Sequence, residues 1–228
     1  MAAQAKFFKT AIAVAVMAAA GASNANLIVN GGFETAIIPA PRAIDGGTTL
    51  SVGATDISSW TVITSTVDWL QNNTPTNNSL TAWGLLPQHG FRFVDLTGLN
   101  AQAPYGGIAQ TIFTVPGTLY DLSFYLGSTT STILGNGDAV ALLTIADTTV
   151  QLQVASTPTS SSDWSLKTGQ FTATGATATL SFVGVSGFNY IGLDNVVVTA
   201  VPEPGSIALM LAGLAAVGSI AARRRPQR

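Results

Sequence analysis

The central part of the chain, residues 26–200, consists of short runs of β-branched and aromatic residues separated by turns rich in glycine, asparagine, serine and threonine. Within residues 119–126 every second side chain, from Tyr120 to Leu126, is apolar, whereas Asp121 and Ser123 fall on the other side of an extended chain. Residues 139–145 are a nearly continuous apolar run. No segment repeats apolar residues with the 3.6-residue period of a helix. The pattern predicts an all-β domain, and the strand lengths and spacing favour a two-sheet jelly-roll sandwich.

The N-terminus is typical of an export signal. Lys6 and Lys9 precede an apolar run at residues 11–20, and small residues stand at Ser23 and Ala25. This order of basic, apolar and small residues predicts a signal peptide over 1–25 that is cleaved after Ala25. A retained N-terminal anchor is the alternative, which the short apolar run disfavours.

The C-terminal segment 201–228 predicts a membrane anchor. Pro202, Glu203 and Pro204 precede eighteen uncharged residues at 205–222, and the chain then continues with a basic tail at 223–228. As a helix the uncharged segment would measure about 27 Å, close to the ~30 Å hydrocarbon core of a bilayer. Flanking arginines favour the cytoplasmic side, so the domain is expected outside the inner membrane, in the periplasm. A core helix is the alternative.

Charge is distributed unevenly along the chain. The formal net charge is −2, but most basic residues lie in the two terminal segments. Residues 26–200 hold three basic residues (Arg42, Arg92 and Lys167) against ten acidic ones, a net charge of −7. Such a domain repels nucleic acid and anionic lipid and suits neutral or cationic ligands. Cysteine is absent, so packing or a bound metal must supply the stability that disulfides give other exported domains.

Several motifs appear in a characteristic order. The domain opens with Asn-Leu-Ile-Val-Asn-Gly-Gly-Phe-Glu at 26–34 and closes with Gly-Leu-Asp-Asn-Val at 192–196. Between them lie Gly-Phe-Arg-Phe-Val-Asp-Leu-Thr-Gly at 90–98 and a Gly-Ile-Ala-Gln-Thr segment that begins at Gly107 and runs to Tyr120. In this order the motifs resemble the DUF642-type, choice-of-anchor C domains, which are galactose-binding-like jelly rolls. The resemblance covers residues 26–199.

The resemblance implies a structural calcium ion between the first and last strands. Its ligands would be the carboxylates of Glu34 and Asp194 and a backbone carbonyl, for which Gly32 is the candidate. Calcium prefers such oxygen ligands, and a bridge between the two ends of the domain would stabilise it. The alternative is that both acids are solvated residues at strand ends.

The C-terminal segment resembles a PEP-CTERM sorting signal. Pro202, Glu203 and Pro204 match its motif, and Arg223, Arg224 and Arg225 match its basic end. The resemblance implies an exosortase-type processing enzyme as partner, cleavage near 202–204, and an organism that makes extracellular polysaccharide. An ordinary C-terminal anchor is the alternative.

Candidate ligand-binding residues are Trp69, Trp83, Tyr105 and Arg92, because flat rings stack on sugar faces and guanidinium groups bond hydroxyls. Burial in the core is the competing reading for each tryptophan, and it is the one we expect for Trp60 and Trp164. The single histidine, His89, is interpreted as a surface-loop residue, not a catalytic one, since no nucleophile motif accompanies it.

These observations predict an exported, non-enzymatic protein of the cell surface, extracellular matrix or biofilm that binds polysaccharide through its jelly roll. A purely structural or adhesive protein without a discrete glycan site is the first alternative. A glycan-active hydrolase is the second.

Overall fold

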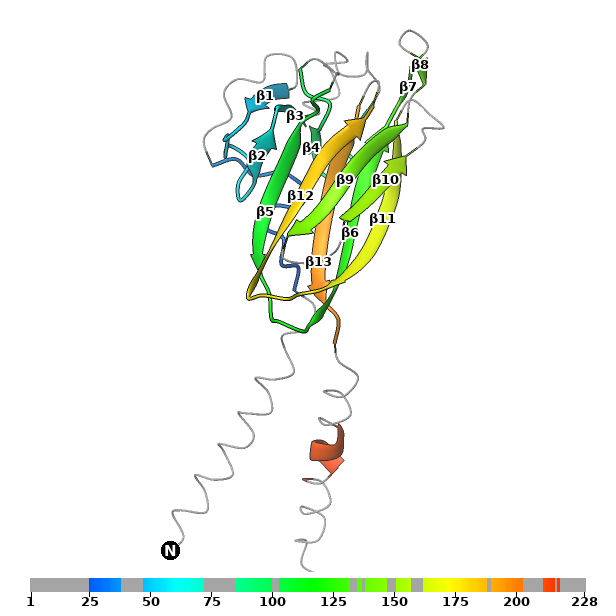
Figure 1. Cartoon of the computed structure of the whole chain (residues 1–228). Coiled ribbons are helices and arrows are strands. Elements are labelled where there is room, and N and C mark those ends of the chain that lie inside the picture. The colour runs from blue at the N-terminus through cyan, green and yellow to red at the C-terminus, as the bar shows by residue number, and fades with distance from the viewer. Residues whose placement is uncertain are drawn as a thin grey trace, which may run out of the picture. The chain divides into compact units, whose positions relative to one another are not determined.

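The structure, a computed structural model of the chain, describes residues 25–37, 47–71, 85–99, 103–131, 135–136, 138–146, 151–156, 162–187, 190–202, 211–215 and 217. Residues Asn26–Val198 form one compact unit (Figure 1). Of the predicted membrane segment 205–222, residues 211–215 and 217 are described and are α-helical. Within the described part of the chain we find no helix of sufficient length and hydrophobicity to span a bilayer.

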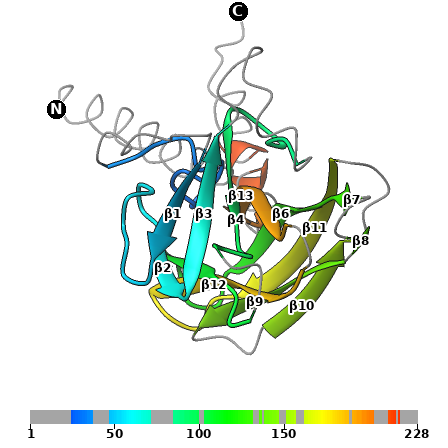
Figure 2. The same cartoon turned by 90° about the horizontal axis from the view of Figure 1, so that it is seen from above.

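The compact unit is a β-sandwich. Its strands are β1 (Gly47–Ser51), β2 (Thr61–Thr64), β3 (Thr66–Gln71), β4 (Arg92–Asp95), β5 (Gly107–Phe113), β6 (Leu119–Ser128), β7 (Thr130–Ser131), β8 (Gly135–Asn136), β9 (Ala139–Ala146), β10 (Gln151–Ser156), β11 (Asp163–Thr172), β12 (Thr177–Ser186) and β13 (Gly192–Ala200). One sheet has the order β1-β3-β4-β13-β6-β11 and the other β10-β9-β12-β5-β2. Figures 1 and 2 show the two sheets as separate layers. The prediction of an all-β, two-sheet sandwich is confirmed.

The strand pairing has jelly-roll topology. Four antiparallel pairs are nested in the sequence: β9 with β10, β6 with β11, β5 with β12, and β4 with β13. Alternate pairs lie in opposite sheets, as when one long hairpin is folded over itself. Strands β1 and β3 extend the first sheet beyond β4, and β2 extends the second beyond β5. The first and last strands of the roll are therefore neighbours.

The core lies between the two sheets and is built from the alternating side chains of each strand. In β6, Tyr120, Leu122, Phe124 and Leu126 are buried, whereas Asp121 is exposed, as the alternation predicted. Aromatic rings connect the layers: Phe124 packs edge-on against Phe182 with centroids 5.0 Å apart. Trp60 is 2% exposed and contacts Phe182, which confirms its expected place in the core.

Candidate functional site

The six-stranded sheet has an outer face that turns away from the core. In β3 and β4, Trp69 and Val94 are register partners that face inward, since the indole N–H of Trp69 donates to the carbonyl of the core residue Phe33 (2.9 Å). Because side chains alternate, the register partners Asp68 and Asp95 face outward. In the following text, the outer face means this side of β1, β3, β4, β13, β6 and β11.

Three ionisable groups gather on the outer face at the β3–β4 pair. Burial raises the pKa of Asp68, and the hydroxyl of Thr49, its register partner on β1, donates to its Oδ1 atom. Burial also raises the pKa of Tyr190, and the charges of Asp95 and Asp68 raise it further. Each carboxylate therefore lies close enough to the tyrosine to influence its ionisation. Perturbed groups of this kind concentrate at functional sites, although structural networks produce them too.

Asp95 is the most strongly perturbed member of the cluster. It is 3% exposed, and burial raises its pKa to about 7 despite hydrogen bonds that favour the carboxylate. Its Oδ1 atom accepts the backbone N–H of Thr97 (3.0 Å) and of Ile191 (2.9 Å), and its Oδ2 atom accepts the Thr97 hydroxyl. Nearby Asp68 raises the pKa a little more. Near neutral pH this group is partly protonated inside the protein.

Aromatic rings continue the outer face beside the acids. Phe93 meets Trp164 edge-on with centroids 5.6 Å apart, and it meets Tyr190 at 6.3 Å. The Trp164 ring lies directly over two strands, because a Cβ atom on Gly127 or Gly192 would come within 2.7 or 2.9 Å of it. Trp164 is half-buried, and its indole N–H donates to a loop carbonyl, so the outer face and not the core holds this residue, contrary to our expectation.

The outer face extends further along β6 and β11. Tyr125 and Leu166 are register partners there, the first half-buried and the second 53% exposed. Beyond them, the side-chain amide of Gln170 donates to Asp121 Oδ1 at 2.7 Å. The outer face thus carries flat rings, hydroxyls and carboxylate acceptors, although Phe93 and Asp95 are themselves buried. These groups suit a ligand with both apolar faces and hydroxyls, as a sugar has.

A second cluster joins the two ends of the domain. The opening segment runs along β13, where Leu27 N–H donates to the Val198 carbonyl (2.8 Å) and Val196 N–H donates to the Gly31 carbonyl (2.9 Å). A Cβ atom at Gly31 would lie 2.0 Å from the Val196 oxygen, so only glycine allows this approach. The glycine-rich opening motif is therefore a docking segment for the last strand.

Asp194, in the closing motif, fixes the loop that leads into β4. It is fully buried, and its Oδ2 atom accepts the backbone N–H of Gln88 and of His89, each at 3.0 Å. Burial raises its pKa to about 6, and the charge of Glu34 contributes to that rise. His89 itself is exposed, as expected of a surface-loop histidine.

Glu34 holds the other side of the same loop. Its Oε1 atom accepts the backbone N–H of Phe91 (2.8 Å) and of Arg92 (3.0 Å). Gly90 lies between the two acids with φ +69°, and a Cβ atom there would come within 2.2 Å of Glu34 Oε1. The two carboxylates and this glycine therefore form one clasp over residues 88–92, which we call the terminal clasp.

The terminal clasp brings together the three residues expected to bind calcium. A Cβ atom at Gly32 would lie 3.9 Å from Asp194 Oδ1 and 3.9 Å from Glu34 Cγ. The Gln88 side-chain oxygen, in the clasped loop, is buried and finds no hydrogen-bond partner among the described residues. Two mutually repelling carboxylates and an unpartnered oxygen are chemically suited to a hard cation. No group of three or more His, Cys, Asp or Glu side chains suited to a metal occurs in the described ranges.

The predicted sugar platform is not assembled as expected. Trp69 is 1% exposed, and the Arg92 guanidinium lies 4.0 Å from its ring centroid. This burial conflicts with a stacking role for Trp69, because its ring faces the core and an arginine. Tyr105 is half-buried and its hydroxyl donates to the Gly187 carbonyl (3.3 Å). Trp83 lies outside the described residues.

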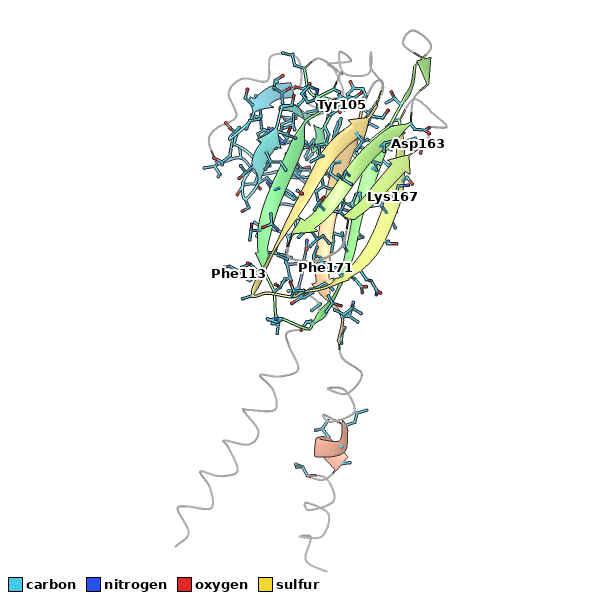
Figure 3. The ribbon with its side chains drawn as sticks, viewed as in Figure 1. Tyr105, Phe113, Asp163, Lys167 and Phe171 are labelled. Carbon is cyan, nitrogen blue, oxygen red and sulfur yellow. The ribbon has the colours of Figure 1, made fainter. Side chains whose placement is uncertain are left out.

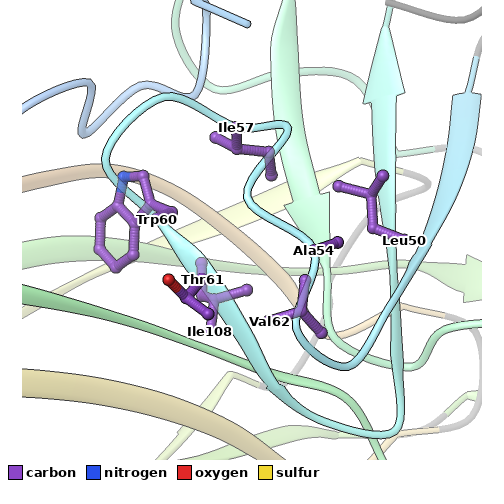
Figure 4. A pocket seen from close by; sticks show the side chains of 7 residues that line it. All are labelled: Leu50, Ala54, Ile57, Trp60, Thr61, Val62 and Ile108. Carbon is purple, nitrogen blue, oxygen red and sulfur yellow. The ribbon is translucent and has the colours of Figure 1, made fainter. Parts of the chain in front are cut away.

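An apolar hollow lies beside β2, shown in Figure 4. It is lined by Leu50, Ala54, Ile57, Trp60, Thr61, Val62 and Ile108. Thr61 is the one polar side chain among these lining residues, so the hollow lacks the converging polar groups that orient a ligand. It is a packing feature of the core edge.

The residues of the sorting segments lie mostly beyond the described ranges. Ala25 and Pro202 are described: Ala25 is the first described residue and is exposed, and Pro202 is exposed after β13. Glu203, Pro204, Arg223, Arg224 and Arg225 lie outside the described residues. The strand β13 ends at Ala200, two residues before the motif.

Sequence reasoning missed the outer-face cluster of Asp68, Asp95, Tyr190, Phe93 and Trp164. Residues 92–95 did not reveal this cluster, because each side of the strand carries one apolar and one polar residue. Phe93 and Asp95 alternate with Arg92 and Val94, so either pair could face the core. Only the pairing with β3 decides which pair faces outward.

Comparison with known proteins assigns both parts of the chain. The model of DUF642, a family described as proteins of unknown function, matches residues 26–189. The model of the PEP-CTERM protein-sorting motif matches residues 200–225. Halomucin from Haloquadratum walsbyi is 28% identical over 195 residues, which cover 84% of this chain and 2% of halomucin. The chain thus spans a small fraction of that relative's length.

Solved structures share the architecture at low identity. The CBM22-1 xylan-binding domain of Paenibacillus barcinonensis Xyn10C is 12% identical, with a TM-score of 0.45 over 81% of this chain and 99% of that one. The enzymatically active domain of bacteriophage CBA120 tailspike protein 4 is 15% identical, with a TM-score of 0.42 over 77% of this chain and 21% of that one. These likenesses are too distant to indicate a ligand.

Proposed function

The chain belongs to the DUF642 family and carries a PEP-CTERM sorting motif, and from this premise we propose that it is an exported protein whose jelly roll binds polysaccharide without catalysis. The observation that carries the proposal is the outer face, where half-buried rings adjoin carboxylates and hydroxyls. Trp164, Tyr190 and Tyr125 supply the rings, and Asp68 supplies a hydrogen-bond acceptor. The domain's net charge of −7 favours neutral sugars over anionic ones.

The route that we propose begins with export and removal of residues 1–25. The apolar segment 205–222 then holds the domain at the inner membrane, with the motif at 202–204 outside. An exosortase-type enzyme processes the chain near that motif and passes the domain to the cell surface or matrix. The exposed position of Pro202, just after the last strand, supports access by such an enzyme.

We further propose that the terminal clasp binds a structural Ca²⁺ ion. Glu34, Asp194, the Gly32 carbonyl and the Gln88 side-chain oxygen would hold it. Burial and the charge of Glu34 raise the pKa of Asp194, and a bound cation would offset both effects. The residues would keep the 88–92 loop fixed beside the outer face. If the melting temperature of the purified domain is the same in excess chelator and in millimolar Ca²⁺, the site is absent.

The binding proposal is tested with purified residues 26–200 in affinity electrophoresis through gels that contain neutral glucans, galactans, mannans or xylans. Tyr125→Ala and Asp68→Asn remove a ring and a charge from the outer face. Thr111→Ala, an exposed substitution on the five-stranded sheet, is the matched control. We expect retention by at least one polysaccharide and a measurable loss of affinity in either outer-face variant. The loss in Tyr125→Ala should be about fivefold, since a stacked ring contributes roughly 1 kcal/mol. Unchanged affinity in both variants would overturn the assignment of the site.

One observation favours a second candidate function. Asp68 and Asp95 are paired carboxylates with raised pKa values, an arrangement that glycoside hydrolases use. Against catalysis, both oxygens of Asp95 accept hydrogen bonds from protein groups, and the side chain is buried. Reducing-sugar release from a bound polysaccharide, abolished in Asp68→Asn, would establish the hydrolase. A structural or adhesive role would instead give self-association and no retention.

A further inference from the structure

One end of the domain exposes apolar side chains that its fold leaves uncovered. The connection between β5 and β6, residues 113–119, carries Phe113 (85% exposed), Val115 (62%) and Leu119 (37%). We call this segment the β5–β6 tip. Three exposed apolar side chains within seven residues are costly to hydrate, and such patches generally mark an interaction surface.

The β5–β6 tip is held rigidly by the neighbouring β11–β12 connection. Thr114 N–H donates to the Ala176 carbonyl (2.9 Å), and Gly117 N–H donates to the Ala173 carbonyl (2.8 Å). Behind the tip, the Tyr120 hydroxyl accepts the N–H of Val115 (2.9 Å). These backbone N–H groups of the tip therefore have hydrogen-bond partners within the domain, and the apolar side chains of the tip are held in a fixed arrangement.

The tip and the β11–β12 connection beside it hold no charged residue. No charged residue occurs in residues 111–120 or in residues 171–193. The first charged residue after the tip is the exposed Asp121, which accepts a hydrogen bond from Gln170. An uncharged apolar loop is suited to the interfacial layer of a zwitterionic bilayer, where aromatic and aliphatic side chains are favoured.

The tip lies at the end of the domain from which the chain leaves. Gln110 of β5 is level with Val29, since its side-chain amide donates to the Val29 carbonyl (2.9 Å), and β5 then continues to Phe113. Leu27 is bonded to Val198, near the end of β13. Figure 3 shows Phe113 and Phe171 at one end of the sandwich and Tyr105 at the other. The chain takes seven steps of at most ~3.6 Å from Val198 to residue 205, so Val198 stays within about 25 Å of the start of the proposed membrane segment.

From these observations we infer that the β5–β6 tip is a lipid-contacting surface that seats the domain on the bilayer while the C-terminal segment anchors it. The inference rests on the proposed membrane segment. The tip would fix the orientation of the domain, with Leu99 and Tyr105 directed away from the bilayer. The sorting motif would then lie near the membrane surface, where a membrane-embedded processing enzyme can reach it.

The test uses the chain from residue 26 to its end, reconstituted in phosphatidylcholine vesicles. The natural chain has no cysteine, so Val115→Cys can carry a single environment-sensitive fluorophore. Leu99→Cys is the matched control, because Leu99 is 68% exposed and apolar but lies beyond the opposite end of β5. Co-flotation with vesicles reports the anchor, and quenching by nitroxide-labelled lipid reports contact of the fluorophore with the bilayer. Phe113→Ser in the Val115→Cys background tests the contribution of the ring.

The expected result is co-flotation of both labelled chains, a blue-shifted emission and several-fold stronger lipid quenching at 115 than at 99, and reduced quenching after Phe113→Ser. Co-flotation with equal, weak quenching at both positions would overturn the inference and leave the anchor intact. Failure to co-float would overturn the proposed membrane segment and the inference with it.

Discussion

Asp95→Asn is the substitution whose effect on stability depends most clearly on pH. The pKa of Asp95 rises from 3.8 to about 7 because the folded protein buries the carboxyl group. A group with a raised folded pKa contributes stability that is fully present below its unfolded pKa and is lost as pH rises through the folded pKa. The window for Asp95 therefore runs from about pH 4 to above pH 7. At ~1.4 kcal/mol per pH unit, up to about 4 kcal/mol of stability is lost across it.

An asparagine would keep the local bonding without the charge. Its oxygen would accept the N–H groups of Thr97 and Ile191, and its amide would donate to the Thr97 hydroxyl, which can accept in place of donating. We therefore expect Asp95→Asn to be more stable than the natural domain at pH 8.5, by up to about 4 kcal/mol. Near pH 4 the two proteins should be about equally stable.

Urea unfolding of residues 26–200 at pH 4, 6 and 8.5, followed by tryptophan fluorescence, measures the difference. Asp121→Asn is the matched control, because Asp121 is exposed and bonded to Gln170 on the surface. The control should change stability by less than about 1 kcal/mol at each pH. Asp95→Asn that destabilises the domain equally at all three pH values would refute the burial argument.

Three further predictions concern the backbone of the terminal clasp, the ion proposed to bind there, and the processing of the two ends of the chain. Gly90→Ala should lower the free energy of unfolding in urea by about 2–4 kcal/mol, because a Cβ atom there meets Glu34 and the φ is +69°. The control Gly53→Ala, with φ +86° and no neighbour within 4 Å, should lower it by only about 1–2 kcal/mol. Equal losses in the two variants would show that contact with Glu34 adds nothing to the cost at Gly90. Millimolar Ca²⁺ should raise the melting temperature by several degrees and Glu34→Gln should abolish the rise, whereas a rise that persists in Glu34→Gln would place the ion elsewhere. Mass spectrometry of the natural product should find a first residue Asn26 and an end near 202–204; an intact Arg228 would contradict processing.

The sandwich was predictable because its strands alternate cleanly. Residues 119–126 alternate between buried and exposed side chains, and β6 has that pattern in the structure. The family resemblance also implied that the opening segment meets the last strand, and the hydrogen bond from Val196 N–H to the Gly31 carbonyl places them together. Local sequence was sufficient for the strands, whereas the contact between the two ends of the domain was expected only from the resemblance.

The outer face was not predictable, because facing direction depends on pairing between distant segments. Trp69 sits beside a polar loop in sequence, but its pairing with Val94 turns the ring into the core. Trp164 is a large apolar residue of the kind usually found in a core. It lies instead on the outer face, where Gly127 and Gly192 leave room for its ring. The sequence shows that side chains alternate between two faces within each strand. Which of the two faces is turned to the core is decided only by contacts with distant segments.

The most direct test of the account is a chemical-shift titration of isotopically labelled residues 26–200 with an oligosaccharide of whichever neutral polysaccharide retains the domain. If the outer face is the glycan site, the perturbed amides and side chains should cluster on β3, β4, β13, β6 and β11, around Asp68, Trp164 and Tyr190. The resonance of the Trp69 indole N–H should be unaffected. Perturbations confined to the five-stranded sheet, or to Tyr105 and its loop, would contradict the outer face as the glycan site.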